Sequence, residues 1–296
     1  MSLSVLLPVY GEANFISEAI ISTLDNIEIT DKLIIILDRT SDNTKAIIED
    51  FASKDARIVM INSPSPGITS ALNFGITYSD ADFIARMDAD DVVINNRFKL
   101  QKKFLESHPK YILIGSNIQL IDTSGRKIGL KVYPNGNNSI KRMLFYYNPI
   151  AHPTVMIRRI VLLKSGLYKI GTDGYEDFYL WEKLSSFGKF KNSRKCFLKY
   201  RIHDNQISKQ KNRSNSLSEK NYYEYLNIQN KRNYRLISLY MDVINKKNRS
   251  LISVFNSKFF LDYFASLVYS PKSTLTLSYY YIINSIVSKI HLKLSK

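Results

Sequence analysis

The fold is decided by one stretch of the sequence, Phe83-Ile84-Ala85-Arg86-Met87-Asp88-Ala89-Asp90-Asp91. Its first three residues are apolar and lead into three carboxylates, so we expect a strand over 82–87 with the acidic cluster at its end. Open α/β sheets bind ligands at the carboxyl ends of their strands. The stretch therefore predicts an α/β protein with a polar site on one edge of the sheet.

Toward the amino terminus, short apolar runs alternate with stretches of helical periodicity. This alternation is typical of a parallel sheet with helices on both faces. The expected strands cover 3–9, 33–37, 58–61 and 82–87, and the expected helices cover 15–24, 45–51 and 70–78.

Beyond the acidic cluster the pattern is more mixed. A helix is expected over 95–107, a strand over 111–121 and a helix over 177–186. After His203 the composition shifts to Asn, Ser and Lys, which is typical of a linker or an exposed loop. We therefore expect two parts: an α/β domain over 1–204 and a basic, Tyr-rich helical extension over 205–296.

The charge of the chain is strongly positive and unevenly distributed. The formal net charge is +16, of which +11 falls within 205–296. A basic protein usually has a nucleic acid, an anionic membrane surface or a phosphorylated ligand as a partner. Cys196 is the single cysteine, so no intrachain disulfide can form. With neither a signal peptide nor a transmembrane helix expected, we predict a cytoplasmic protein.

Two further polar clusters follow expected strands, at Pro8-Val9-Tyr10-Gly11-Glu12 and at Leu37-Asp38-Arg39-Thr40-Ser41-Asp42. Together with 88–91 they should meet on one edge of the sheet. Carboxylates in D-x-D spacing can present oxygen to a hard divalent cation. Alone, such a cluster is equally well explained as a solvated turn, and Asp42 is better explained as an N-cap or first-turn residue of the next helix.

With these motifs in order, the sequence resembles the inverting glycosyltransferase family 2, which has a GT-A fold: a Rossmann-like, mostly parallel central sheet with helices on both faces. The resemblance covers roughly 3–204. It is carried by Pro8-Val9-Tyr10, Asp38 through Asp42, Gly67 through Gly75, Ala85 through Asp91, His152 through Met156, Glu176 through Trp181, and Tyr200-Arg201-Ile202-His203.

The resemblance implies a site for a nucleotide-sugar donor. The expected donor-binding residues are Pro8, Tyr10, Glu12, Asp38, Asn73, Arg86, Asp88 and Asp90. It also implies a divalent metal, Mn²⁺ or Mg²⁺, bound by Asp90 and His203. Arg39 departs from the family pattern, which commonly has a second Asp at this place. Asp91 is expected to serve local structure or the donor sugar.

The transfer reaction needs a base for the proton of the acceptor hydroxyl. By resemblance this base is Asp177, with Glu176 as the alternative base or as an acceptor-orienting residue. Both acidic residues could instead favour a helix start through the helix dipole. His152 and Trp181 are the expected acceptor-site residues, and the aromatic ring of Trp181 could form a wall of that site.

The function implied is an inverting transfer of a sugar from a nucleoside-diphosphate sugar, with UDP as the favoured nucleotide, to a hydroxyl of a lipid-linked or oligosaccharide glycan. Enzymes of this kind build surface polysaccharides such as O-antigen or capsule. The alternative is a non-catalytic nucleotide-sugar or glycan-binding protein on the same fold. A dinucleotide-dependent oxidoreductase is disfavoured, because no G-x-G-x-x-G turn follows the first expected strand.

The basic extension has three interpretations: nucleic-acid binding, a solvated helical cap that forms a dimer, and peripheral contact with the anionic inner leaflet. No nucleic-acid-binding motif is present. Clustered Lys and Arg gain about 1 kcal/mol each near an anionic surface, and apolar helical faces such as the one over 282–290 can dip into the interface. We favour membrane contact. The sequence leaves the sugar, the acceptor, the choice of metal and the oligomeric state open.

Overall fold

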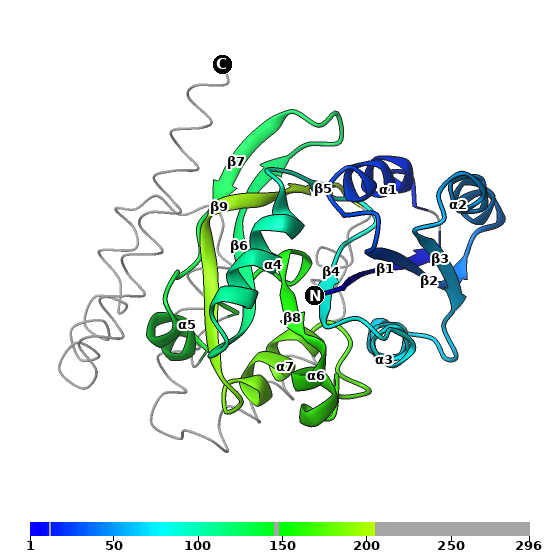
Figure 1. The fold of residues 1–296 in the computed structure, drawn as a ribbon. Coiled ribbons are helices and arrows are strands. Elements are labelled where there is room, and N and C mark those ends of the chain that lie inside the picture. Colours follow the sequence, from blue (N-terminus) through cyan, green and yellow to red (C-terminus); the bar gives the residue numbers. More distant parts are fainter. Residues whose placement is uncertain (12, 145–147, 205–296) are drawn as a thin grey trace.

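The computed structural model describes residues 1–11, 13–144 and 148–204 (Figure 1). Glu12 and the whole expected extension over 205–296 lie outside the described residues. The predicted amino-terminal alternation of strands and helices is confirmed, with each element within a few residues of its expected bounds. Asp42 lies in the first turn of a helix whose N-cap is Ser41, as expected.

The described chain forms strands β1 to β9. Their bounds are β1 Leu3–Gly11, β2 Lys32–Thr40, β3 Ile58–Asn62, β4 Phe83–Arg86, β5 Val92–Val93, β6 Tyr111–Ile121, β7 Lys127–Lys131, β8 Met156–Arg158 and β9 Lys189–Arg201. The helices are α1 Ile16–Leu24, α2 Asp42–Lys54, α3 Ile68–Tyr78, α4 Arg97–Ser107, α5 Asn137–Met143, α6 Arg159–Ser165 and α7 Glu176–Leu184, with a short 3₁₀ turn η1 at His152–Thr154.

All strands belong to one sheet with the order β3-β2-β1-β4-β8-β6-β9-β5, and β7 pairs with β6. The first four strands are parallel to one another. Strand β8 is antiparallel to both β4 and β6, whereas β9 runs parallel to β6 and antiparallel to β5. The sheet is therefore mixed. The expectation of a mostly parallel sheet was wrong for its second half, where antiparallel neighbours need no helical crossover between them.

Helices cover both faces of the sheet, as expected (Figure 1). Alternate residues of each parallel strand face opposite sides, so one apolar core forms on each face. One core packs α1, α2 and α4 against strand side chains such as Leu7 and Leu33. The other packs α3, α6 and α7 against strand side chains such as Leu6 and Ile34. Packing of helices on both faces of the sheet fixes the positions of the strand ends.

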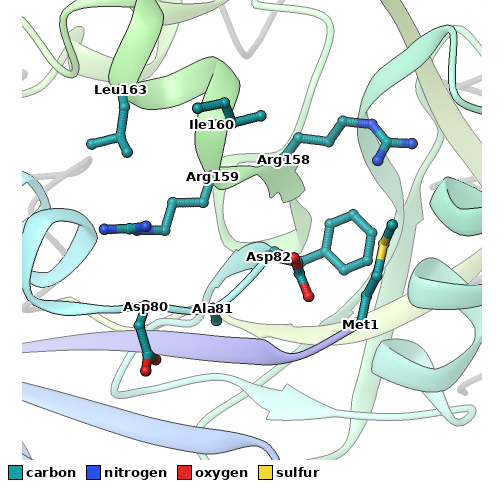
Figure 2. A pocket seen from close by; sticks show the side chains of 9 residues that line it. Met1, Asp80, Ala81, Asp82, Arg158, Arg159, Ile160 and Leu163 are labelled. Atoms are coloured by element: carbon teal, nitrogen blue, oxygen red, sulfur yellow. The ribbon is translucent and has the colours of Figure 1, made fainter.

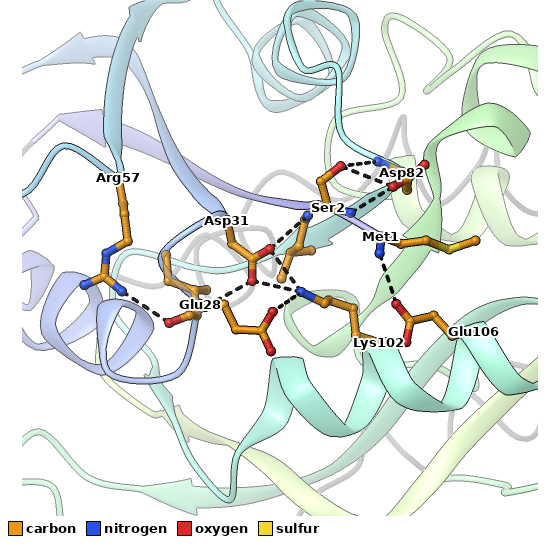
Figure 3. A network of polar contacts seen from close by, with 10 residues as sticks. Met1, Ser2, Glu28, Asp31, Arg57, Asp82, Lys102 and Glu106 are labelled. Carbon is orange, nitrogen blue, oxygen red and sulfur yellow. Dashed lines mark hydrogen bonds and ion pairs between the residues drawn. The ribbon is translucent and has the colours of Figure 1, made fainter.

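A polar network lies at the end of the sheet where the parallel strands begin (Figure 3). The ammonium of Lys102 on α4 lies 2.7 Å from Glu28 and 3.1 Å from the carboxylate of Asp31, which is only 1% exposed. Asp31 also accepts a hydrogen bond from the backbone N–H of Leu3. This network ties the start of β1 to α4, while the opposite edge stays available for a site.

Among the described residues, no helix is long and apolar enough to cross a membrane.

Candidate active site

The acidic cluster lies in the loop that follows β4, at the edge where the parallel strands end. Asp88, Asp90 and Asp91 each offer an oxygen, and these oxygens lie within 4.8 Å of one another. Arg86, the last residue of β4, donates a hydrogen bond of 2.7 Å to Asp88. Burial raises the pKa of Asp88 to about 6, although the charge of Arg86 opposes this shift. The cluster concentrates negative charge that a cation can compensate.

Asp91 is the most enclosed member of the cluster, with 0% exposure. Its Oδ1 accepts a hydrogen bond of 2.9 Å from the backbone N–H of Arg201, which anchors the end of β9. Its Oδ2 is buried and has no hydrogen-bond partner among the described residues. Burial, together with the charges of Asp90 and Asp88, raises the pKa of Asp91 well above its ordinary value. An orphaned carboxylate oxygen in a hard-oxygen cluster fits a divalent cation.

His203 lies against this cluster, as the sequence predicted. Its Nε2 is 2.8 Å from Oδ2 of Asp90, and the two side chains are 17% and 28% exposed. The ring of Phe15 packs against the imidazole with 5.7 Å between centroids. An imidazole and carboxylates are ligands that Mn²⁺ accepts. The residues present therefore fit the metal that the sequence implied.

Two fully buried arginines hold the backbone of the acidic loop. Arg201 donates from Nε to the carbonyl of Asp90 at 2.9 Å, and its other end pairs with Glu18 at 2.6 Å. Arg97 on α4 donates to the carbonyl of Arg86 at 2.8 Å. Burial lowers the pKa of Arg97 to about 9, which leaves it charged at neutral pH. These cations partly balance the buried carboxylates and fix where the loop lies.

The expected nucleotide pocket starts at the ends of β1 and β2. Tyr10 and Asp38 are register partners in the parallel pair. Tyr10 is 58% exposed, and the guanidinium of Arg39 lies 4.8 Å from the centre of its ring. Asp38 is 7% exposed and accepts hydrogen bonds from Nε of Arg39 at 3.0 Å and from the N–H of Gly67 at 2.9 Å. The guanidinium of Arg39 therefore contacts both the carboxylate of Asp38 and the ring face of Tyr10.

A second acidic pair lies in the first turn of α7, as predicted. Glu176 is buried, and Asp177 is half-buried and accepts a hydrogen bond of 2.5 Å from the amide of Asn148. Burial, reinforced by the charge of Asp177, raises the pKa of Glu176 to about 7. Burial also raises the pKa of Asp177, against the opposing hydrogen bonds from Phe178 and Asn148. Carboxylates with raised pKa values suit proton transfer near neutral pH.

Arg86 couples the two acidic groups electrostatically. Burial raises the pKa values of Asp88, Glu176 and Asp177, and the charge of Arg86 opposes the shift in each of them. One cation from the end of β4 therefore lies within electrostatic reach of both groups.

His152 is buried beside the acidic pair, and Trp181 lies beneath it. Nδ1 of His152 is 3.7 Å from Glu176, and its ring meets that of Trp181 edge-on at 5.7 Å between centroids. Trp181 is 0% exposed and belongs to an apolar core. The role expected for its ring, as a wall of the acceptor site, stays a prediction. Trp181 supports His152 from below.

Asn73, an expected donor-binding residue, bonds to the backbone of a distant loop. Its side-chain amide donates to the carbonyl of Tyr168 and accepts from the N–H of the same residue, both at 2.9 Å. Both polar ends of the side chain are thus engaged by one backbone unit 95 residues away. Asn73 ties α3 to the loop before α7.

Sequence reasoning missed three residues that shape the site: Asn148, Tyr168 and Arg201. Arg201 lies in the motif Tyr200-Arg201-Ile202-His203, in which only His203 has a predicted role. Asn148 and Tyr168 carried no local signal, because each contacts the site over a separation of 16 residues or more.

A cavity of about 260 Å³ lies elsewhere on the domain (Figure 2). It is lined by Met1, residues 80–83 and side chains of β8 and α6 such as Arg158 and Ile160. These belong to the edge where β1 and β4 begin, away from the acidic cluster. No predicted site residue lines it.

The sequence of the chain is similar to those of known glycosyltransferases. The sequence profile described as "Glycosyl transferase family 2" matches residues 4–166. An uncharacterized glycosyltransferase of Haemophilus influenzae is 28% identical over 239 residues, covering 76% of this chain and 74% of the relative. The O-antigen biosynthesis glycosyltransferase WbnJ of Escherichia coli is 31% identical, covering 55% of this chain and 64% of WbnJ. The amylovoran biosynthesis glycosyltransferase AmsE of Erwinia amylovora is 30% identical, covering 53% and 59%.

Solved structures agree on the fold. S. aureus TarS 1-349, solved in complex with UDP-GlcNAc, superposes with a TM-score of 0.58 at 16% identity, over 76% of this chain and 64% of that one. The match therefore spans less than two thirds of TarS, WbnJ and AmsE. The fold is therefore GT-A-like, and the family match identifies the chain as a glycosyltransferase. The chain belongs to glycosyltransferase family 2, because the family profile covers more than half of its length.

Proposed function

We propose that this enzyme is an inverting transferase that moves a sugar from a UDP-sugar to a hydroxyl of a glycan acceptor in surface polysaccharide biosynthesis. The observation that carries the proposal is the presence of two acidic groups within electrostatic reach of Arg86: Asp88, Asp90 and Asp91 after β4, and Glu176 and Asp177 at the start of α7. The names of WbnJ, AmsE and the UDP-GlcNAc complex of TarS support the substrate class.

The donor nucleotide is proposed to bind where β1 and β2 end. Pro8 and the exposed ring of Tyr10 offer an apolar surface to the base, and Asp38 accepts hydrogen bonds from base or ribose once Arg39 moves aside. Arg86 and Asp88 contact the nucleotide further along. Glu12 belongs to this proposal by resemblance alone.

Asp90 and His203 are the proposed ligands of a divalent cation, Mn²⁺ or Mg²⁺. Asp91 belongs to the same acidic cluster, and its Oδ2 is buried without a hydrogen-bond partner among the described residues. When bound, such a cation stabilises the negative charge that develops on the leaving diphosphate.

Asp177 is the proposed base. The acceptor oxygen attacks the anomeric carbon and loses its proton to the carboxylate, while the bond from that carbon to the diphosphate breaks and UDP leaves. Attack opposite the leaving group inverts the anomeric centre, so an α-linked donor gives a β-linkage. The amide of Asn148 orients the Asp177 carboxylate. The neighbouring Glu176 has a pKa raised to about 7, so it is partly protonated at neutral pH.

The acceptor is proposed to be lipid-linked and to approach from the side of His152. Residues 205–296 carry a net charge of +11, which supports peripheral contact with the anionic inner face of the cell membrane. Binding of the full chain to vesicles with and without anionic lipid tests this. Equal binding to neutral and anionic vesicles would contradict it.

The function is tested with a panel of nucleotide sugars, each with Mn²⁺ or Mg²⁺ and with octyl glycosides as acceptors, scored by release of nucleoside diphosphate. We expect release that depends on one UDP-sugar, on acceptor and on metal. Binding of a UDP-sugar without release from any donor would identify the chain as a non-catalytic binding protein on the same fold.

A further inference from the structure

We infer that Tyr168 is a positioning residue of the transfer reaction: its hydroxyl sets the tautomer of His152, so that the single ring N–H of His152 faces Glu176. The inference rests on the proposed function, because it gives Glu176 and its neighbour Asp177 a defined hydrogen-bonding environment during transfer.

The side chains of Tyr168, His152 and Glu176 follow one another in a series of contacts that ends at the acidic pair. The hydroxyl of Tyr168 is 2.8 Å from Nε2 of His152, and Nδ1 on the other side of that ring is 3.7 Å from Oε1 of Glu176. Tyr168, His152 and Glu176 are 4%, 6% and 8% exposed. Water is therefore largely excluded, and each polar atom depends on its neighbour in the series.

The direction of the hydrogen bonds follows from the charges. Burial and the nearby positive charge of Arg86 lower the pKa of His152 well below its ordinary value, so the imidazole is neutral and carries one N–H. Burial raises the pKa of Tyr168, so its hydroxyl keeps its proton. If Nε2 carried the N–H, a nitrogen lone pair would face Glu176 and would repel its carboxylate above pH 7, where Glu176 is ionised. Donation from the Tyr168 hydroxyl to Nε2 avoids that repulsion and leaves Nδ1–H directed at Glu176.

The position of Tyr168 is itself fixed from α3. The side-chain amide of Asn73 forms hydrogen bonds of 2.9 Å with the backbone N–H and with the backbone carbonyl of Tyr168. Further along the same loop, Asp173 accepts a hydrogen bond of 2.7 Å from the hydroxyl of Thr69, in the first turn of α3. The helix that starts beside Asp38 thus holds the loop that carries Tyr168. Helix α3 therefore supports both Asp38 on the proposed donor side and Tyr168 on the proposed acceptor side.

The loop is also attached to α7. The ammonium of Lys183 donates to the carbonyl of Leu167 at 3.1 Å, and the N–H of Gly174 donates to the second oxygen of Glu176. One oxygen of Glu176 is therefore fixed by the backbone, and the other faces Nδ1 of His152 at 3.7 Å. Removal of the Tyr168 hydroxyl frees the imidazole to change tautomer without moving the backbone.

Two measurements on the full-length chain test the inference. Long-range ¹H–¹⁵N spectra report the imidazole tautomer without any substrate, and comparison with His152→Gln assigns the signal. We expect an Nδ1–H tautomer in the natural protein and a loss of that tautomer's dominance in Tyr168→Phe. In kinetics, Tyr168→Phe should lower kcat roughly 10-fold, the worth of one net hydrogen bond, with the donor KM unchanged.

Tyr78→Phe is the matched control, because Tyr78 is on α3 and 53% exposed, so kcat and the spectra should not change. An Nε2–H tautomer in the natural protein, or an unchanged kcat in Tyr168→Phe, overturns the inference. Absence of transfer by the natural protein with every donor would instead overturn the proposed function, and the tautomer would still decide the arrangement inferred for Tyr168.

Discussion

Nε2 of His203 lies 2.8 Å from Oδ2 of Asp90, although the two residues are 113 positions apart in the chain. The short strand β5 follows the acidic loop directly and pairs antiparallel with the end of β9 through Val92 and Lys199. That pairing brings the segment after β9 back to the loop after β4. The acidic cluster is therefore closed by the last part of the described domain.

Asp90→Ala should abolish metal-dependent turnover. The variant removes the carboxylate that His203 contacts, and charge stabilisation by a metal is worth several kcal/mol, so we expect nucleotide release to fall at least roughly 100-fold. Nucleotide release titrated with Mn²⁺ measures the effect. Asp80→Ala is the control, since Asp80 is an exposed carboxylate on the opposite edge of the sheet. Equal activity of Asp90→Ala and Asp80→Ala would remove Asp90 from the site.

Lys102→Met should destabilise the fold severely. It leaves the carboxylate of Asp31, 1% exposed, without its cation, and breaking a buried ion pair costs about 3–5 kcal/mol. Denaturant unfolding measures the loss. Glu28→Gln removes the exposed partner of the same ammonium and should cost under about 1 kcal/mol. Similar losses for the two variants would show that burial does not decide the energetics of this network.

Glu176→Gln should change how stability depends on pH. Burial raises the pKa of Glu176 from 4.5 to about 7 in the folded protein. A raised folded pKa means that the natural protein loses stability as pH rises from about 4.5 through about 7. The glutamine variant lacks this loss, so its melting temperature should gain on that of the natural protein between about pH 5 and pH 8. A constant difference in melting temperature across that range would exclude the raised pKa.

Gly67→Ala should weaken both stability and activity. Gly67 has φ of +110°, and an added Cβ would overlap the carboxylate of Asp173. A strained conformation of this kind costs more than about 1 kcal/mol, and the N–H that Asp38 accepts would shift. Thermal melting and the donor KM check both effects. Gly136→Ala is the control, because nothing lies within 4 Å of its added Cβ; a comparable loss there would contradict the explanation.

The parallel half of the fold was predictable from local sequence because β1, β2 and β4 are apolar runs buried on both faces. The other half was not. Strand β5 has two residues and β8 has three, too few to show a period. In β9, charged residues interrupt the apolar alternation, and its place in the sheet depends on long-range pairing with β6.

The candidate site was likewise predictable from the sequence only in part. Asp88, Asp90 and His203 were predicted together through the family resemblance, and the structure brings them together. The positions of Asn73 and Trp181 were not predictable, because a motif records which residue occurs and not which way its side chain faces. Asn73 turns to a backbone 95 residues away, and Trp181 turns into the core.

Asp177→Asn tests whether Asp177 is the base of the transfer reaction. The amide keeps the shape of the side chain and its place beside Asn148 but cannot accept the acceptor proton, and general-base assistance is worth roughly 10²–10⁴ in rate. The measurement pairs the rate of sugar transfer with UDP-sugar affinity by calorimetry. The account predicts a transfer rate lowered by that factor with donor affinity unchanged. Unimpaired transfer by the variant would contradict it.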